Sequence, residues 1–124
     1  MRLLSDLLRR TSALLGLLCL LAGTAGAHAI IVESTPKMNE VVAGPVLDIK
    51  LRFNVRIDGD RSKLTLIFAD SAAHPVDLAR QAAPDSLTAS VSHLLPGSYK
   101  LHWQVLANDG HITQGDIPFQ VAKQ

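Results

Sequence analysis

The chain has 124 residues, of which 48% are hydrophobic and 19% are charged, and its formal net charge is +1 at pH 7. This length suits one domain with a single core, and the near-zero charge without a basic run argues against nucleic acid as a partner. The single cysteine, Cys19, excludes a disulfide within the chain.

Residues 1–27 predict a secretory signal peptide. Three arginines give a basic start, and residues 13–22 form an apolar run that is shorter than the ~20 residues of a membrane span. Ala25-Gly26-Ala27 supplies the small residues of a cleavage site, so the mature chain is expected to begin at His28 and to comprise residues 28–124.

Cleavage would also remove the cysteine. Cys19 lies inside the apolar run and follows Leu18, whereas a lipoprotein signal places a small residue before its cysteine. From His28 onward the sequence holds nine Lys plus Arg and ten Asp plus Glu. Export without disulfides predicts a protein of a bacterial periplasm that is held together by its core alone.

The mature chain predicts an all-β domain. Residues 46–55 show the clearest pattern, because apolar and polar side chains alternate and place one face in a core. Residues 37–45 are expected to form a loop and residues 58–60 a turn. The seven expected strands are 29–33, 46–55, 63–69, 76–79, 87–91, 99–105 and 117–121.

The strand at 99–105 is expected to form the centre of the core. One parity carries Tyr99, Leu101, Trp103 and Val105, which include the only Tyr and the only Trp of the chain. The preceding Leu-x-Pro-Gly-x-Tyr pattern is typical of a tyrosine corner. Seven short strands with regular turn signals predict an immunoglobulin-like, Greek-key β-sandwich or small barrel, cupredoxin-like in outline.

A candidate metal site follows that strand. Asp109 and His111 are two residues apart, so their side chains can point the same way from an extended backbone. As residue one of the mature chain, His28 would add its α-amine and ring Nδ1 as a chelate; an α-amine has a pKa of ~7.7–8.0 and loses its proton readily to a metal. Three nitrogens and one oxygen suit Cu(II), with Ni(II) second, whereas Zn(II) prefers tetrahedral sites.

A structural explanation of the same residues stays open. An exported chain can begin with histidine by accident, and Asp-Gly is a common turn pair that would place His111 at a hairpin end without a ligand role. The remaining histidines, His74, His93 and His102, are expected to be surface residues, because they lie beside loop residues or on the solvent parity of a strand.

The ordered motifs resemble the CopC-type copper-binding proteins of the bacterial periplasm. They are His28-Ala29, Ser34-x-Pro36, Leu51-x-Phe53, Pro96-Gly97-x-Tyr99, Trp103-x-Val105, Asp109-Gly110-His111, Gly115 and Phe119-x-Val121. The resemblance implies a monomeric, non-enzymatic protein that binds one Cu(II) per chain through the His28 amine and ring, Asp109 and His111. It also implies an inner-membrane partner of the CopD type.

Two departures from the family pattern stand out. Many relatives carry an acidic residue just after the strand phenylalanine, in a Phe-Ser-Glu-like run, where this chain reads Phe53-Asn54-Val55. The methionine-rich Cu(I) segment of some relatives is also missing, since Met38 is the only methionine after the signal. The chain is therefore expected to be a Cu(II)-only member.

Two other functions are weighed against this interpretation. An N-terminal histidine with a second histidine resembles the histidine brace of copper monooxygenases, but one Trp and one Tyr leave little aromatic surface for a sugar. An aspartate ligand would also fill the position that oxygen chemistry needs open. The other alternative is a metal-free immunoglobulin-like module that binds a protein, and a metal titration separates it from the copper-binding interpretation.

Overall fold

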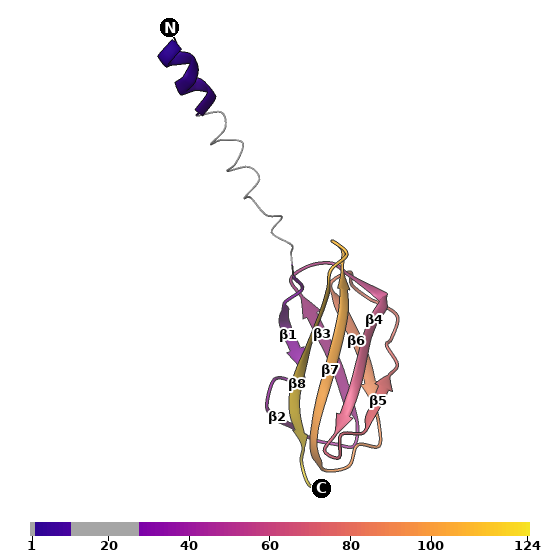
Figure 1. The fold of residues 1–124 in the computed structure, drawn as a ribbon. Helices are drawn as coiled ribbons and strands as arrows, with labels where there is room; N and C mark the ends of the chain where they lie inside the picture. Colours follow the sequence, from indigo (N-terminus) through magenta and orange to yellow (C-terminus); the bar gives the residue numbers. More distant parts are fainter. Residues whose placement is uncertain (1, 11–27) are drawn as a thin grey trace.

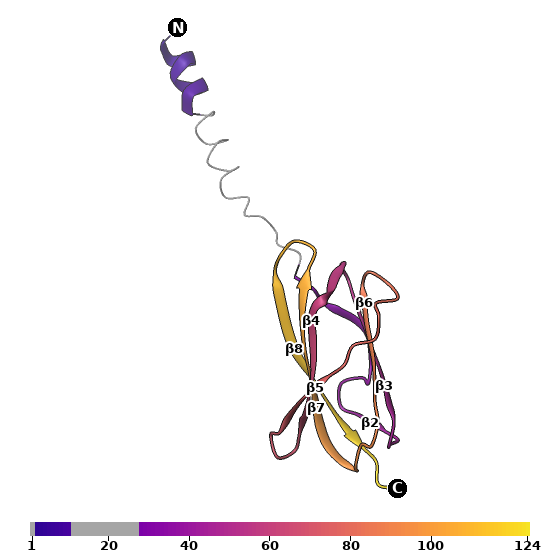
Figure 2. The same cartoon turned by 90° about the vertical axis from the view of Figure 1, so that its right-hand side faces the viewer.

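The computed structural model describes residues 2–10 and 28–124, which are drawn as a short helix and a β-sandwich in Figures 1 and 2. Most of the predicted signal peptide, including its cleavage site, falls on residues 1 and 11–27 and lies outside the described residues. Within residues 2–10 and 28–124, no helix is both long and apolar enough to cross a membrane.

Eight strands form two sheets that pack face to face. The three-stranded sheet has the order β1-β3-β6, and the five-stranded sheet has the order β2-β8-β7-β4-β5. The strands are β1 (Ile31–Thr35), β2 (Glu40–Val42), β3 (Leu47–Phe53), β4 (Ile57–Phe68), β5 (Ala73–Val76), β6 (Ser86–Val91), β7 (Gly97–Ala107) and β8 (Ile112–Val121). The predicted all-β, Greek-key sandwich is confirmed, with eight strands in place of seven.

The core forms where the inner faces of β3 and β7 meet. Leu51 and Phe53 of β3 and Leu101 and Val105 of β7 are at most 1% exposed. The rings of Phe53 and Trp103 meet across the sandwich in an edge-type contact, with centroids 5.4 Å apart. The expected central role of the strand around Trp103 is thus confirmed.

The predicted tyrosine corner is also present. The phenol of Tyr99, near the start of β7, donates a 2.5 Å hydrogen bond to the backbone carbonyl of Leu95. This bond ties the beginning of β7 to the segment that leads into it.

Two expected turn or loop regions belong to strands. The loop expected at 37–45 contains β2, which pairs in parallel with the end of β8; three residues are too few to show a period of two. The turn expected at 58–60 lies inside β4, at an irregularity where the pairing with β7 shifts between Asp58 and Lys63. Asp58 Oδ1 accepts hydrogen bonds from the backbone N–H groups of Asp60 and Arg61 there. These turn-type hydrogen bonds form as expected, but they stabilise a bulge within β4 and not a turn between two strands.

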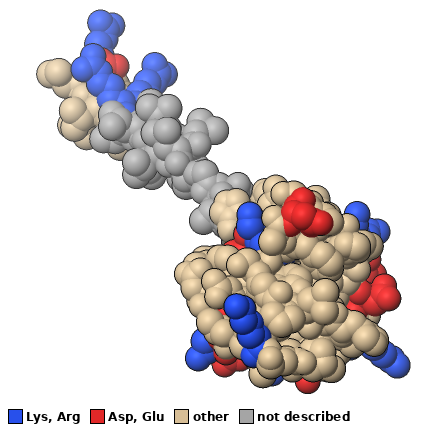
Figure 3. Space-filling model, turned by 90° about the horizontal axis from the view of Figure 1, so that it is seen from below, with Lys and Arg blue, Asp and Glu red and all other residues tan. Residues whose placement is uncertain are grey.

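Positive and negative side chains are interspersed on the end of the sandwich that carries the C-terminus, the end facing the viewer in Figure 3. That view shows uncharged residues between isolated basic and acidic groups, without a patch of one sign.

Candidate metal centre

Residues 108–111 form a tight loop between β7 and β8. The N–H of Ala107 donates to the carbonyl of His111 at 2.9 Å, and the N–H of Gly110 donates to the carbonyl of Ala107 at 3.0 Å. Gly110 has a φ of 86°, a left-handed conformation that glycine adopts without steric cost. The loop thereby turns Asp109 and His111 toward each other.

Asp109 is bound twice by His111. Its Oδ1 accepts the backbone N–H of His111 at 3.0 Å, and its Oδ2 lies 3.0 Å from ring Nδ1. The backbone hydrogen bond, followed by the side-chain one, holds the pKa of Asp109 below its ordinary value of 3.8. The carboxylate is therefore ionised at neutral pH, and it lies beside the Nδ1 atom of the ring.

His28 lies beside this loop in space, although it is far from the loop in the sequence, at the start of the β domain. Its ring centroid is 6.0 Å from that of His111, and the two planes are inclined by 57°. The next residue, Ala29, is only 2% exposed and belongs to the core. A buried alanine therefore holds the backbone of the exposed His28 against the end of the sandwich.

The three predicted ligands are close in pairs but do not form a closed site. His111 is the common member, with Asp109 on one side and His28 on the other. Among the residues that the structure describes, no group of three or more His, Cys, Asp or Glu side chains is arranged to hold a metal ion. In the full chain, moreover, the nitrogen of His28 is a peptide amide because Ala27 precedes it.

The other three histidines have local partners of their own. The His74 ring stacks on Phe68 with centroids 4.4 Å apart, and His93 Nδ1 lies 3.0 Å from the hydroxyl of Ser92. His74 and His93 are exposed, as expected for surface histidines. His102 is half-buried, and its Nδ1 lies 2.7 Å from Oδ1 of Asp116, its cross-strand neighbour. Sequence reasoning missed this pair, since finding it requires the register of β7 and β8.

Residues 31–122 match the family described as the CopC domain. The chain belongs to the CopC family. Copper resistance protein C of Xanthomonas campestris pv. juglandis is 32% identical over 110 residues, which span 82% of this chain and 86% of that protein. Copper resistance protein C of Escherichia coli is 28% identical over 115 residues, spanning 86% of this chain and 90% of that protein.

Solved structures of CopC-family proteins share the fold. CopC from Methylosinus trichosporium OB3b superposes with a TM-score of 0.68 at 28% identity, covering 78% of this chain and 96% of that one. PcoC from Escherichia coli, a methionine-rich copper resistance protein, superposes with a TM-score of 0.64 at 25% identity, covering 77% of this chain and all of that one. This chain has two methionines, Met1 and Met38, so it is not methionine-rich.

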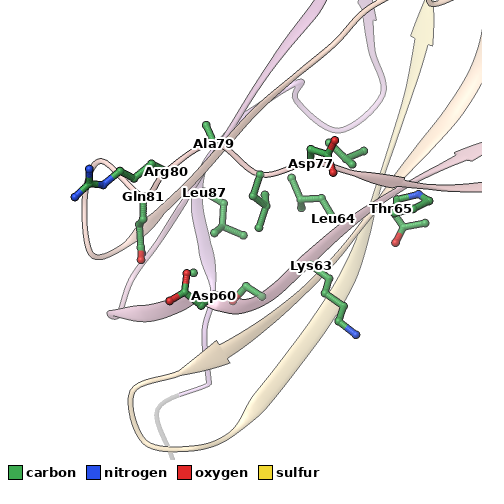
Figure 4. A pocket seen from close by; sticks show the side chains of 14 residues that line it. Asp60, Lys63, Leu64, Thr65, Asp77, Ala79, Arg80, Gln81 and Leu87 are labelled. Carbon is green, nitrogen blue, oxygen red and sulfur yellow. The ribbon is translucent and has the colours of Figure 1, made fainter.

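One surface pocket of this CopC-family chain lies away from the candidate ligands. It has a volume of about 620 Å³ and lies between β4 and the segment that follows β5 (Figure 4). Charged residues of both signs line it, including Asp60, Lys63, Asp77 and Arg80, and no histidine does. The candidate metal centre is therefore identified by the metal-binding atoms of exposed side chains, and not by a pocket in the surface.

Proposed function

We propose that this chain is a periplasmic copper-binding protein that holds one Cu(II) per chain at its mature N-terminus. It buffers copper or passes the ion on, without catalysing a reaction. The observation that carries the proposal is the contact between His28 and His111, whose rings are 6.0 Å apart in a chain of the CopC family. Two relatives bear the name copper resistance protein C, which is consistent with copper as the bound ion.

The distance between the two rings fits a shared metal ion. A metal–imidazole nitrogen bond is about 2.0–2.1 Å long, so two imidazoles on opposite sides of one ion have centroids roughly 6 Å apart. A His111 ring nitrogen takes this role, and Nδ1 is the one that lies beside Asp109. Small rotations of exposed side chains would bring the rings to a common ion without moving the core.

Asp109 completes the proposed donor set. The His28 amine and ring, a His111 ring nitrogen and one Asp109 oxygen give three nitrogens and one oxygen, a combination that suits tetragonal Cu(II). Because its pKa is lowered, Asp109 already carries the negative charge that a cation needs. Its Oδ2 lies 3.0 Å from His111 Nδ1, close to the separation of two neighbouring donors that each bind one ion at about 2.0–2.1 Å.

Export controls the assembly of this site. The amine of His28 exists only after cleavage behind Ala27, so the precursor lacks one of the four donors. Copper is therefore bound in the periplasm and not during synthesis. From there, the ion would pass to an inner-membrane transporter of the CopD type.

The test is a competition titration of Cu(II) against a chelator. The processed protein, which should begin at His28 by mass spectrometry, is compared with a variant that carries one extra glycine before His28 and with His111→Ala. Each change removes one donor, so we expect affinity to fall on the order of a hundredfold, about 2.8 kcal/mol. The matched control, His93→Ala, removes an exposed histidine elsewhere and should bind as the unmodified protein does.

Circular dichroism checks that each variant is folded. Equal affinity of the glycine-extended and the unmodified proteins would show that the amine is not a ligand. The proposed site would then be wrong.

A further inference from the structure

Asn54 pairs twice with the segment that carries His28. The N–H of Ile30 donates to Asn54 Oδ1 at 2.8 Å, and the N–H of Asn54 donates to the carbonyl of Ile30 at 2.9 Å. The regular ladder between β1 and β3 ends at the pair of Ile31 and Phe53. The Asn54 side chain therefore extends the pairing by one residue beyond the sheet, in the direction of His28.

The same turn holds the other half of the candidate metal centre. Residues 54–56 connect β3 to β4, and the backbone carbonyl of Arg56 accepts the N–H of Asn108 at 3.0 Å. Asn108 is the first residue of the loop that contains Asp109 and His111. Figure 1 shows the N-terminal segment, this turn and the β7–β8 loop at the same end of the sandwich.

The spacing leaves His28 little freedom. It is one residue from the buried Ala29 and two from Ile30, whose N–H and carbonyl are both bound to Asn54. Without the Oδ1 acceptor, the backbone at Ile30 would keep only one of these two hydrogen bonds. The end of the chain would then have to be ordered when the metal binds, which lowers affinity by the entropy of that ordering.

We propose that Asn54 is a positioning residue for copper, which holds the mature N-terminus in place opposite His111 before the ion arrives. This inference rests on the proposed function, because it assumes that His28 is a ligand. Asn54 does not itself touch the ion. It acts through Ile30 and Ala29, and the turn that carries it fixes the two halves of the site relative to each other.

The test compares Asn54→Ala, which removes the acceptor, with Asn54→Asp, which keeps an acceptor oxygen at the same place. Both are made in the processed protein. Asn54→Ala should bind Cu(II) roughly tenfold more weakly, the equivalent of ordering about one further backbone residue. Asn54→Asp should retain the affinity. The electron paramagnetic resonance spectrum of bound Cu(II) should be the same in both, since all four donors remain.

A second readout follows the hydrogen bond itself in the metal-free protein. Amide hydrogen exchange at Ile30 should accelerate in Asn54→Ala and stay slow in Asn54→Asp. Asn39→Ala is the control for a general loss of stability: Asn39 has a φ of 61° in a turn outside the candidate metal centre. Its replacement should lower the unfolding temperature and leave both Ile30 exchange and copper affinity unchanged.

The outcomes separate the two hypotheses. If unmodified protein binds copper independently of its amine, the proposed function fails and the positioning role fails with it. If the amine matters but Asn54→Ala binds as tightly as unmodified protein despite faster exchange at Ile30, only the positioning role is overturned. Weaker binding without faster exchange at Ile30 would overturn it as well.

Discussion

Asp109 accepts two hydrogen bonds from one residue, the backbone N–H and the ring Nδ1 of His111. This arrangement fixes the carboxylate, the imidazole and the loop backbone together in a solvent-exposed place. A metal ion would find the imidazole and the carboxylate already held beside each other. At the scale of single residues, the candidate metal centre is therefore partly preorganised without any ion.

The titration of Asp109 tests that arrangement. Its pKa is depressed in the folded protein, so the two hydrogen bonds stabilise the loop fully above the unfolded value of about 3.9. That stabilisation is lost as the pH falls through the folded pKa. NMR titration of the metal-free protein should give a midpoint below 3.8 for the carboxyl of Asp109, with the amide of His111 shifting in parallel.

His111→Ala provides the control for this titration. It removes the ring hydrogen bond and keeps the backbone one, which is the larger cause of the shift. The Asp109 midpoint should therefore rise only part of the way. A midpoint at or above 3.8 in the unmodified protein would contradict the two hydrogen bonds.

The β7–β8 hairpin carries the ligand loop, and its packing depends on one glycine. Gly115 lies opposite Trp103 in the pairing of the two strands. A Cβ built on Gly115 would lie 2.7 Å from Cζ2 and 2.9 Å from Cε2 of the indole. The absence of a side chain thus leaves room for the Trp103 indole, whose ring centroid lies 5.4 Å from that of Phe53.

Gly115→Ala should destabilise the fold. The indole belongs to the core and can move only by disturbing its neighbours, so we expect a loss of about 1–3 kcal/mol in the free energy of unfolding. Gly59→Ala is the matched control, because its Cβ would come equally close, 2.7 Å, but to the end of the Gln81 side chain. Chemical denaturation of both variants measures the two losses in stability. Equal losses would show that Trp103 does not require a glycine at position 115.

The sequence predicted best those strands in which apolar and polar residues alternate over many positions. Apolar and polar side chains alternate along all of β3 and along residues 99–105 of β7, so the sequence indicated which side chains face the core. β2 has three residues, and residues 112–116 of β8 include Gln114, Gly115 and Asp116 without a regular apolar period, so neither showed a clear signal. The bulge in β4 contains residues that are typical of turns, so the sequence predicted a turn where the strand continues.

For the candidate site, the sequence indicated the donor residues but not the contacts that support them. The donor types of His28, Asp109 and His111, together with the family resemblance, indicated a copper site, and the structure places these residues in neighbouring pairs. The contact of Asn54 with Ile30 depends on the register of β1 against β3, which no local pattern encodes. From the sequence alone, Asn54 stood out only as part of a departure from the family pattern, and its hydrogen bonds to Ile30 were not predicted.

At the scale of the whole molecule, the fold separates the proposed copper site from the core. The N-terminal segment and the β7–β8 loop meet at one end of the sandwich, and the C-terminus leaves from the other (Figure 1). Ala29 is buried in the core at the end of the sandwich that carries the candidate site, whereas His28 and His111 are exposed. At the proposed site, the ion would therefore bind and leave without unfolding the sheets, as the proposed role of passing copper on requires.

This separation predicts that acid removes copper before it affects the fold. All proposed ligands bind deprotonated; a free imidazole titrates near pH ~6.5 and an α-amine near ~7.7–8.0, so Cu(II) affinity should fall steadily from pH 8 to pH 5. The lowered pKa values of Glu33 and Asp109 belong to groups with ordinary values of 4.5 and 3.8. The stabilisation from these two groups is lost only as the pH falls through their depressed values, well below pH 5.

Competition titrations at pH 5, 6, 7 and 8, each with a circular dichroism spectrum, measure both properties. The glycine-extended protein is the matched control: it lacks the amine, so its affinity should depend less on pH above 7, while its fold responds as that of the unmodified protein. An affinity that stays flat across this range would contradict a donor set of amine and imidazoles. A loss of β-structure in parallel with copper would contradict the independence of the site from the core.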